Sequence, residues 1–282
     1  MFLFQIRHLF RVLGIAKIFH ARDPVGNFPA MLLLDERKKL RAVSVISGHA
    51  FTVMPEESLH YGECMNVIDA VNQRISVRQF TDQEVEHDVL RQLVIDASRA
   101  PSGGNVQPWR IYVLEKEATD RLRAVIAGNP EVAPPEYDIY PSGLVEPYRT
   151  NRFALGEQMY AKLGIPREDK AGRLRQMAKN MQFFDAPASM FCFIDRGMGA
   201  PQWSDLGMFL QTFMLLATER GLGTCAQEYW SVQHKAVREF CGAPDNELLF
   251  CGMAIGYTDT SAPVNSLVSE RMPFDDFAKF VK

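Results

Sequence analysis

The segment "SDLGMFLQTFMLLATERG" (residues 204–221) constrains the fold most, because read as a helix it is apolar on nearly every face. Ser204 or Asp205 can cap its N-terminus, and Gly221 can end it. Such a helix must be buried, either in a domain core or at a subunit interface. The apolar segments "APASMFCFID" and "ELLFCGMAIGYTD" predict buried strands before and after it. A chain of 282 residues is long enough to bury a substantial core of this kind.

The rest of the chain from Met65 onward also shows regular patterns. In "DQEVEHDVL" the acids predict the start of a helix that Thr81 or Asp82 can cap. Residues 129–149 contain five prolines and three tyrosines and predict a long connection without regular structure, such as a functional lid or a disordered insert. The other expected elements are a helix in "MNVIDAVNQR", a strand in "WRIYVLE", a helix in "EATDRLRAVIAG" ending at Gly128, helices near 151–163 and 167–182, and a short terminal helix in "PFDDFAKFVK".

The first 64 residues differ from the remainder, and we expect a boundary between residues 1–64 and residues 65–282. The stretch "MFLFQIRHLFRVLGIAKIFHAR" is apolar and basic, with no acid before Asp23. This pattern fits an amphipathic targeting or membrane-surface segment. It equally fits an extension without a role in the fold, upstream of a true start at Met54 or Met65. The sequence leaves both alternatives open.

Composition narrows the class of protein. A formal net charge of −3 with 47% hydrophobic and 23% charged residues is ordinary for a soluble globular protein and gives no reason to expect nucleic acid as a partner. No apolar run approaches the roughly 20 residues that a membrane span needs. The five cysteines are odd in number, widely spaced and without a Cys-x-x-Cys pair. We therefore expect no disulfide framework, no metal site and a cytoplasmic location.

The segment "RISVRQF" places Arg74, Ser76 and Arg78 at alternating positions. In an extended backbone these side chains point the same way, so that two guanidinium groups and a hydroxyl converge on one spot. This arrangement suits a phosphate dianion. A solvated edge with ordinary surface charges is the alternative.

A second polar stretch, "APSGGNVQPW", runs from Ala100 to Trp109. Its glycines allow close backbone approach and positive φ angles, while Asn105 and Gln107 offer both donors and acceptors, as a heterocycle with imide and ring-nitrogen groups requires. The segment "GLGTCA" (221–226) matches a dinucleotide fingerprint, but it follows a long helix instead of a strand, so we reject that interpretation. No nucleophile motif is present. Phosphate clamps and amide groups without an acid–base set indicate that a cofactor performs the reaction.

Taken together, "RISVRQF", "APSGGNVQPW", "GLGTCAQ" and "APVNSLVSERMPF" resemble the FMN-dependent nitroreductase family, in family order and across residues 65–282. The segments "QFFDAPASMFCFIDR" and "PQWSDLGMFLQTFMLLATERGLGTCAQEYW" look most like its nitrobenzoate and nitroaromatic reductase branch. The resemblance implies an α+β fold with a central, mostly antiparallel sheet flanked by helices. It also implies an intertwined homodimer with FMN at the subunit interface, and helix 205–219 would then pack at that interface.

The resemblance assigns roles to three groups of residues. The FMN phosphate and ribityl chain would be held by Arg74, Ser76, Arg78 and Arg271. The flavin would be lined by Pro101, Ser102, Gly103, Asn105 and Gln107, some of them from the partner subunit, with Ala226, Gln227 and Glu228 near the ring face or its N5 edge. Loop 129–149 would cover the substrate side, where Tyr137, Tyr140 and Tyr148 offer stacking surface. Ile75 departs from the family pattern, which often has a second basic residue there.

The activity implied by the resemblance is a ping-pong oxidoreduction in which NAD(P)H delivers hydride to FMN and an electron-poor acceptor, such as a nitroaromatic compound, then takes it. No side chain is nominated as an acid or base. Other flavin chemistry on the same fold, namely quinone or enone reduction or reductive dehalogenation, is the first alternative. A flavin-binding protein without turnover is the second, and a domain without cofactor is the third.

Overall fold

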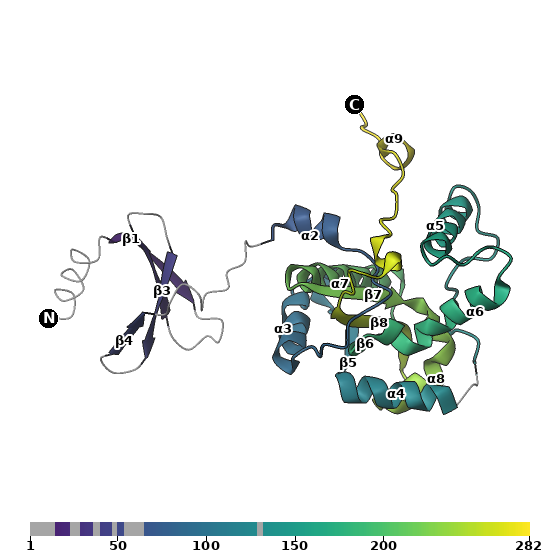
Figure 1. Cartoon of the computed structure of the whole chain (residues 1–282), viewed down its shortest axis with the longest axis horizontal. Helices are drawn as coiled ribbons and strands as arrows, with labels where there is room; N and C mark the ends of the chain where they lie inside the picture. The colour runs from purple at the N-terminus through teal and green to yellow at the C-terminus, as the bar shows by residue number, and fades with distance from the viewer. Residues whose placement is uncertain (1–14, 23–28, 36–39, 47–49, 54–64, 129–131) are drawn as a thin grey trace. The chain divides into compact units, whose positions relative to one another are not determined.

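The structure, a computed structural model, describes residues 15–22, 29–35, 40–46, 50–53, 65–128 and 132–282. The chain divides into two units, residues 1–64 and residues 65–282 (Figure 1). The described residues of the first unit form a four-stranded antiparallel sheet in the order β1-β2-β3-β4. Its strands are β1 (Ile15–Arg22), β2 (Pro29–Asp35), β3 (Leu40–Ile46) and β4 (Ala50–Val53). The sequence patterns had not predicted a sheet in this part of the chain.

The second unit is built on a four-stranded sheet in the order β5-β6-β8-β7, in which every neighbouring pair is antiparallel. The strands are β5 (Trp109–Leu114), β6 (Ala188–Asp195), β7 (Leu222–Gln227) and β8 (Glu247–Tyr257). Strands β6 and β8 are the two predicted buried strands, and they lie in the middle of the sheet. The expected antiparallel sheet within an α+β fold is confirmed. Strand β7, formed by "LGTCAQ", had not been predicted.

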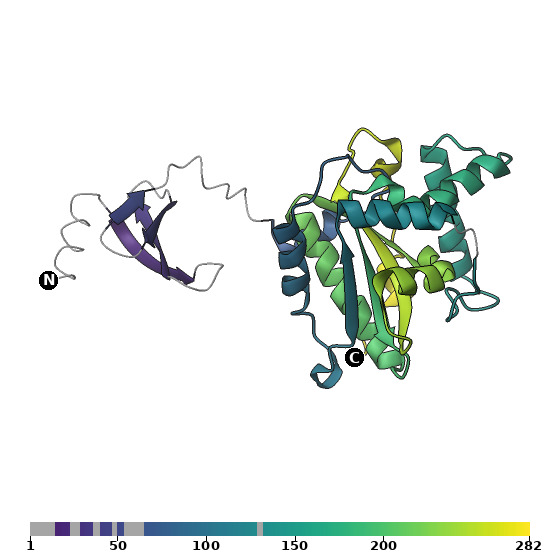
Figure 2. The ribbon, with the colours of Figure 1, turned by 90° about the horizontal axis from the view of Figure 1, so that it is seen from below.

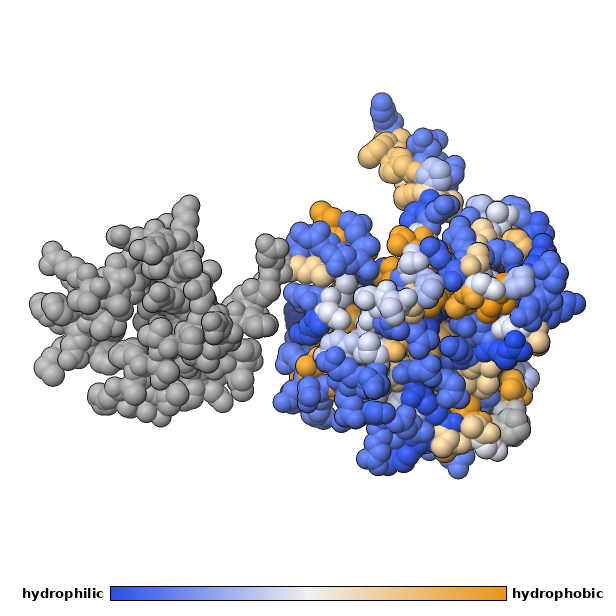
Figure 3. All heavy atoms as spheres, in the orientation of Figure 1, coloured by the Kyte–Doolittle hydropathy of each residue, from blue (hydrophilic) through white to orange (hydrophobic). Residues whose placement is uncertain are grey.

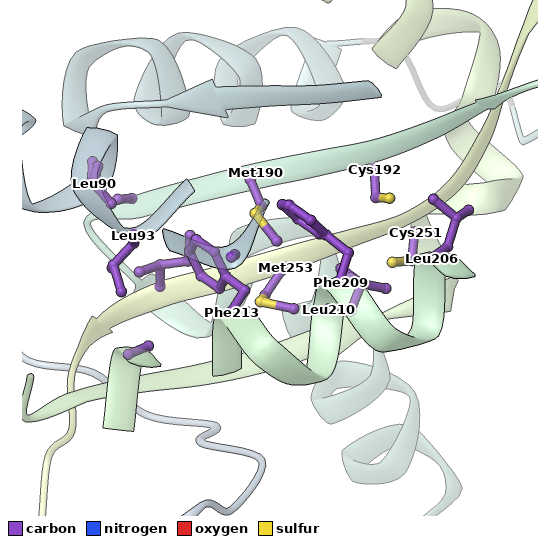
Figure 4. Close-up of a cluster of buried hydrophobic side chains, with 14 of the residues drawn as sticks. Leu90, Leu93, Met190, Cys192, Leu206, Phe209, Leu210, Phe213, Cys251 and Met253 are labelled. Carbon is purple, nitrogen blue, oxygen red and sulfur yellow. The ribbon is translucent and has the colours of Figure 1, made fainter. Parts of the chain in front are cut away.

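Helices cover both faces of this sheet (Figure 2). On one face, α3 (His87–Ala97) and α7 (Ala200–Glu219) pack over Met190 and Cys192 of β6 (Figure 4). On the other face, α4 (Lys116–Gly128) and α8 (His234–Cys241) pack over Phe191 and Phe193, which alternate with Met190 and Cys192 along β6. Because successive residues of a strand point to opposite faces, a strand buried on both faces has a continuous apolar sequence. This is why "APASMFCFID" shows no alternation.

The remaining elements are shorter or more exposed. They are the helices α2 (Val67–Gln73), α5 (Tyr148–Lys162), α6 (Lys170–Ala178) and α9 (Phe274–Phe277), with the 3₁₀ turns η2 (Gly103–Asn105), η3 (Lys179–Asp185), η4 (Glu228–Gln233) and η5 (Pro263–Ser266). Residues 132–147 contain neither helix nor strand, as predicted for this connection. Among the described helices, none is long and apolar enough to cross a bilayer.

Two predicted helix starts were wrong. Helix α7 begins at Ala200 instead of Ser204 or Asp205, because a proline in its first turn is preorganised for helix. Helix α3 begins at His87 instead of following a Thr81 or Asp82 cap. The backbone N–H of Thr81 instead donates to the carbonyl of Tyr257 (2.9 Å), which ties this stretch to the end of β8. The predicted helix end at Gly221 is confirmed, since this residue follows α7 with φ +72°.

Two segments of the second unit contain several strongly exposed apolar side chains. In α2, Val67 and Ile68 are 73% and 71% exposed. Near the C-terminus, Phe277 and Phe280 are 67% and 81% exposed, and Figures 1 and 3 show this segment projecting from the body of the unit. Exposed aromatic and aliphatic side chains gathered in this way indicate surfaces that another protein covers.

Candidate functional site

The segment after α2 is fixed along the free edge of β7. Ser76 forms a parallel bridge with Thr224, and the N–H of Val77 donates to the Thr224 carbonyl (2.9 Å). The N–H of Arg78 donates to Oδ1 of Asn265 in η5 (2.8 Å). These bonds hold the alternating residues 74–78 in an extended conformation, the backbone that the phosphate interpretation requires.

Three guanidinium groups gather at this edge. Burial, and then the positive charge of Arg271, lower the pKa of Arg74. Burial raises the pKa of the Cys225 thiol, against the opposing charges of Arg78 and Arg74. The ion pairs formed by the described residues include none of these arginines. A cluster of like charges without a carboxylate partner is unfavourable by itself and fits a dianionic ligand such as phosphate.

Two cavities of about 1270 and 400 Å³ open beside this cluster. The larger lies between α5 and residues 267–277, and the smaller between α5, η3 and residues 225–229. Four residues line both cavities, namely Arg78, Tyr140, Arg152 and Met159. In the described part of the chain, no three His, Cys, Asp or Glu side chains gather as metal ligands.

Gln227, at the end of β7, lines the smaller cavity and contains a buried acceptor without a partner. Its side chain is 2% exposed, and its amide nitrogen donates to the carbonyl of Asn180 (2.9 Å). Its amide oxygen has no hydrogen-bond partner among the described residues. A buried acceptor left unpaired costs about 1–3 kcal/mol. Arginines suited to a phosphate, beside cavities lined by polar, aliphatic and aromatic side chains, together fit FMN.

Ala226 and Glu228 flank Gln227 and also line the smaller cavity. Burial raises the pKa of the Glu228 carboxyl, and no neighbouring cation lowers it. The structure thus brings six of the proposed cofactor residues to one edge of the sheet. They are Arg74, Ser76, Arg78, Ala226, Gln227 and Glu228, and Arg271 joins them from the C-terminal segment.

The stretch from Pro101 to Gln107 has the backbone expected of a ligand-contacting loop. Asn105 and Gln107 have φ angles of +58° and +51°, which are costly for residues with a Cβ and are common at functional sites. The N–H of Gln107 donates to Ser102 Oγ (3.0 Å), and the N–H of Gly103 donates to the carboxylate of Asp205 (3.3 Å). Buried Asp205 therefore anchors this loop to α7.

Within one chain, this loop lies far from the arginines. It leads into Trp109 of β5, the opposite edge strand from β7. Trp109 pairs with Ile194 of β6. On the other side of the sheet, Thr224 pairs with Ile255 of β8, which in turn pairs with Ala188 of β6. Six residues along β6 and three strand spacings separate the two positions, which amounts to roughly 20 Å or more. A single chain does not bring the two groups of predicted FMN contacts together.

The three predicted substrate tyrosines have different environments. Tyr140 lines both cavities, and the guanidinium carbon of Arg152 lies 4.2 Å from the centre of its ring. Tyr137 donates its hydroxyl to the carbonyl of Phe250 and packs edge-on against Trp203, outside both cavities. Tyr148 is exposed at the start of α5 and also lines neither. Only the Tyr140 placement favours a contact with substrate.

Sequence patterns missed Arg152 and Met159 on α5 and Asn180 in η3, which all line the cavities. Helix α5 contains no buried residue, so its sequence lacks the apolar stripe that marks an inward face. Asn180 was hidden for another reason, because its contact with Gln227 joins residues 47 positions apart. No local signal could have identified these residues.

Comparison with known proteins agrees with this geometry. A model of the nitroreductase family matches residues 71–257. The chain is 37% identical to a nitrobenzene nitroreductase of Ectopseudomonas oleovorans over 217 residues, 76% of this chain and 96% of the relative. It is 36% identical to a 4-nitrobenzoate reductase of Pseudomonas putida over 213 residues, 75% of this chain and 93% of the relative. The crystal structure of an FMN and NADPH-dependent nitroreductase NfnB from Sphigopyxis sp. strain HMH is similar, with 42% identity, a TM-score of 0.73, and coverage of 77% of this chain and 99% of that one.

Proposed function

The chain belongs to the nitroreductase family, and from this premise we propose that it is an FMN-dependent oxidoreductase that uses NAD(P)H to reduce nitroaromatic or similarly electron-poor compounds. The observation that carries the proposal is the group of three arginines without carboxylate partners beside a cavity that Ala226, Gln227 and Glu228 line. When bound, FMN supplies hydride transfer between a nicotinamide and an acceptor.

The chain's own residues bind and orient. Arg74, Arg78 and Arg271 would hold the phosphate through charge-assisted hydrogen bonds, with the Ser76 hydroxyl beside them. Gln227 would lie beside the ring, and its side chain is fixed by the bond from its amide nitrogen to the carbonyl of Asn180. Because the backbone of residues 74–78 is bonded to β7 and η5, these groups are preorganised before a ligand arrives.

We further propose that the active form is a homodimer. In one chain the arginines and the loop containing Pro101, Ser102, Gly103, Asn105 and Gln107 lie at opposite edges of the sheet. A second copy could bring its own loop to the arginines of the first. The exposed apolar residues of α2 and of the C-terminal segment supply surfaces for such an interface.

Residues 65–282 would form the FMN-binding domain, with residues 1–64 as an extension outside the family match. We place the protein in the cytoplasm. The four cysteines of the described residues are all free thiols, as is usual in a reducing compartment.

The visible absorption spectrum of the purified protein tests the proposed function. We expect a flavin spectrum that bleaches when NADPH is added without oxygen and returns when a nitroaromatic compound follows. Return with a quinone or enone but not with a nitroaromatic compound would move the assignment to the other flavin chemistry. A bound flavin that NADPH does not bleach would indicate a carrier. A colourless protein that takes up no FMN would contradict the proposal.

A further inference from the structure

Helix α5 contributes an arginine to both cavities whose charge is not neutralised. Arg149, one turn earlier on the same helix, is paired with Glu146 (2.6 Å). Arg152 belongs to none of the ion pairs formed by the described residues. Its contact is with Tyr140, whose ring it covers.

The contact with Tyr140 leaves the hydrogen-bond donors of the Arg152 guanidinium unused. The attraction between a guanidinium and the face of an aromatic ring is electrostatic and does not depend on a conventional hydrogen-bond acceptor. No acceptor for these N–H groups is present among the described residues. A planar cation held at one place with its donors unused suits an oxyanion that can take two parallel hydrogen bonds.

Acidic side chains also line the cavities, but none forms an ion pair with Arg152. Glu270 and Asp276 line the larger cavity, and Glu228 lines the smaller. If Glu228 lay against the Arg152 guanidinium, the pKa of its carboxyl would be lowered, whereas burial raises it. The positive charge of Arg152 is therefore available to a ligand.

The surroundings of Arg152 indicate what kind of ligand carries the anion. Met159, Ile139 and Tyr140 give the smaller cavity an apolar wall beside the guanidinium, while Ala226 to Glu228 form another part of its lining. Three other arginines are already gathered at the β7 edge for a phosphate. Arg152 belongs to a different element and lies beside Tyr140, the one predicted substrate tyrosine that lines the cavities.

We propose that Arg152, oriented by Tyr140, selects acceptors that have a carboxylate on the aromatic ring. The inference rests on the proposed function and deepens it by naming the substrate class. One relative is named for a neutral compound, nitrobenzene, and another for an acid, 4-nitrobenzoate. Family membership therefore does not decide between neutral and acidic acceptors. The unpaired guanidinium favours the acidic class.

The test compares 4-nitrobenzoate with 4-nitrobenzamide, which has nearly the same shape without the charge. For the wild-type protein we expect a kcat/KM at least tenfold higher for the acid. Arg152→Gln should lower kcat/KM for 4-nitrobenzoate by about 10- to 100-fold, the range of a charged hydrogen-bonded pair, and leave 4-nitrobenzamide within twofold. Arg152→Lys keeps the charge but loses the ability to form two parallel hydrogen bonds, so its kcat/KM for 4-nitrobenzoate should lie between those of the wild type and Arg152→Gln.

Arg149→Gln is the matched control, because it removes the same charge from the same helix outside the cavities. Its acid-to-amide preference should equal that of the wild type. A second readout does not depend on turnover. The Kd of benzoate, measured by calorimetry on the FMN-loaded protein, should rise at least tenfold in Arg152→Gln and stay unchanged in Arg149→Gln.

Every other outcome either overturns the inference or contradicts the proposed function. An equal loss with both acceptors and a higher KM for NADPH would show that Arg152 binds a phosphate of the nucleotide, and loss of FMN would place it in the cofactor site; either overturns the inference. A wild type that reduces both compounds equally and binds benzoate no better than benzamide overturns it as well, while the proposed function stands. A wild type that binds benzoate tightly but reduces neither compound contradicts the proposed function and leaves the acid site in place.

Discussion

Replacing Arg271 with glutamine should change FMN affinity and the stability of the FMN-free protein in opposite directions. Arg271 is exposed and comes from the C-terminal segment, yet its charge contributes to the lowered pKa of Arg74. In the FMN-free protein the two like charges repel each other. With a phosphate present, both charges stabilise the complex.

The expected magnitudes follow from these two roles. A charged hydrogen bond contributes about 1.5–3 kcal/mol, so Arg271→Gln should raise the Kd of FMN by about 10- to 150-fold. Partly exposed charges interact by about 1 kcal/mol or less. The unfolding free energy of the FMN-free variant should therefore be unchanged or higher by up to about 1 kcal/mol. The local hydrogen bonds of Arg271 go to Ser269 and to the Glu270 carbonyl, which water can replace.

Fluorescence titration of FMN and urea unfolding of the FMN-free protein measure the two quantities. Arg121→Gln is the control, because Arg121 is an exposed helix arginine paired only with Glu117 (3.4 Å), far along the chain from the cluster. It should leave the Kd of FMN within twofold. An Arg271→Gln variant that binds FMN as the wild type does would refute the phosphate assignment. One that binds FMN weakly because its FMN-free form loses several kcal/mol would refute the electrostatic argument.

Three further predictions concern groups that support the site. Burial raises the pKa of Glu136, but the hydrogen bond from Arg196 and the nearby positive charges outweigh it and hold that pKa below its ordinary value of 4.5. A carboxyl whose pKa is lowered in the folded state stabilises the protein at neutral pH, and this contribution disappears as the pH falls below about 4.5. Glu136→Gln should therefore lower the free energy of unfolding by about 1–3 kcal/mol at pH 7. In urea unfolding, the stability of this variant should also fall less steeply at acidic pH. Gly252→Ala should cost about 1–3 kcal/mol in the same assay, because its Cβ would overlap the buried ring of Trp230, whereas an unchanged midpoint would show that the ring can move. Asp205→Ala removes the anchor of Gly103 and should weaken FMN binding by about tenfold while the proposed dimer stays intact in sedimentation. Wild-type affinity would separate this loop from the cofactor.

Sequence patterns predicted the elements whose signals are local. Helix α4 ends at Gly128 as expected, and β6 and β8 lie where continuous apolar segments predicted buried strands. The start of α3 could not be found in this way, because the bond from Thr81 to Tyr257 keeps the preceding residues extended. That bond joins residues 176 positions apart, so the capping preference of Thr81 was overridden by a tertiary contact.

The same distinction between local signals and tertiary contacts applies to the residues of the candidate site. The alternation of Arg74, Ser76 and Arg78 predicted a convergence that the bridge to Thr224 now provides. Arg271 was assigned only through the family resemblance, since nearly 200 residues separate it from the others. Tyr137 had the same composition-based support as Tyr140, yet its hydroxyl finds an acceptor in β8 and its ring packs against Trp203. A tyrosine with a buried partner cannot be distinguished by sequence from one that faces a cavity.

The two walls of the site differ in how firmly the fold holds them, and this difference has a consequence for specificity. The cofactor side is bonded into β7 through Val77 and Arg78, so a change of backbone there would disturb the sheet edge. The proposed substrate side includes α5, which has no buried residue. Few apolar contacts mean a low cost for local change, both in conformation and in sequence. Substitutions on α5, Arg152 among them, can therefore alter which acceptor is bound while FMN binding and global stability stay the same, whereas the corresponding changes at residues 74–78 would affect both.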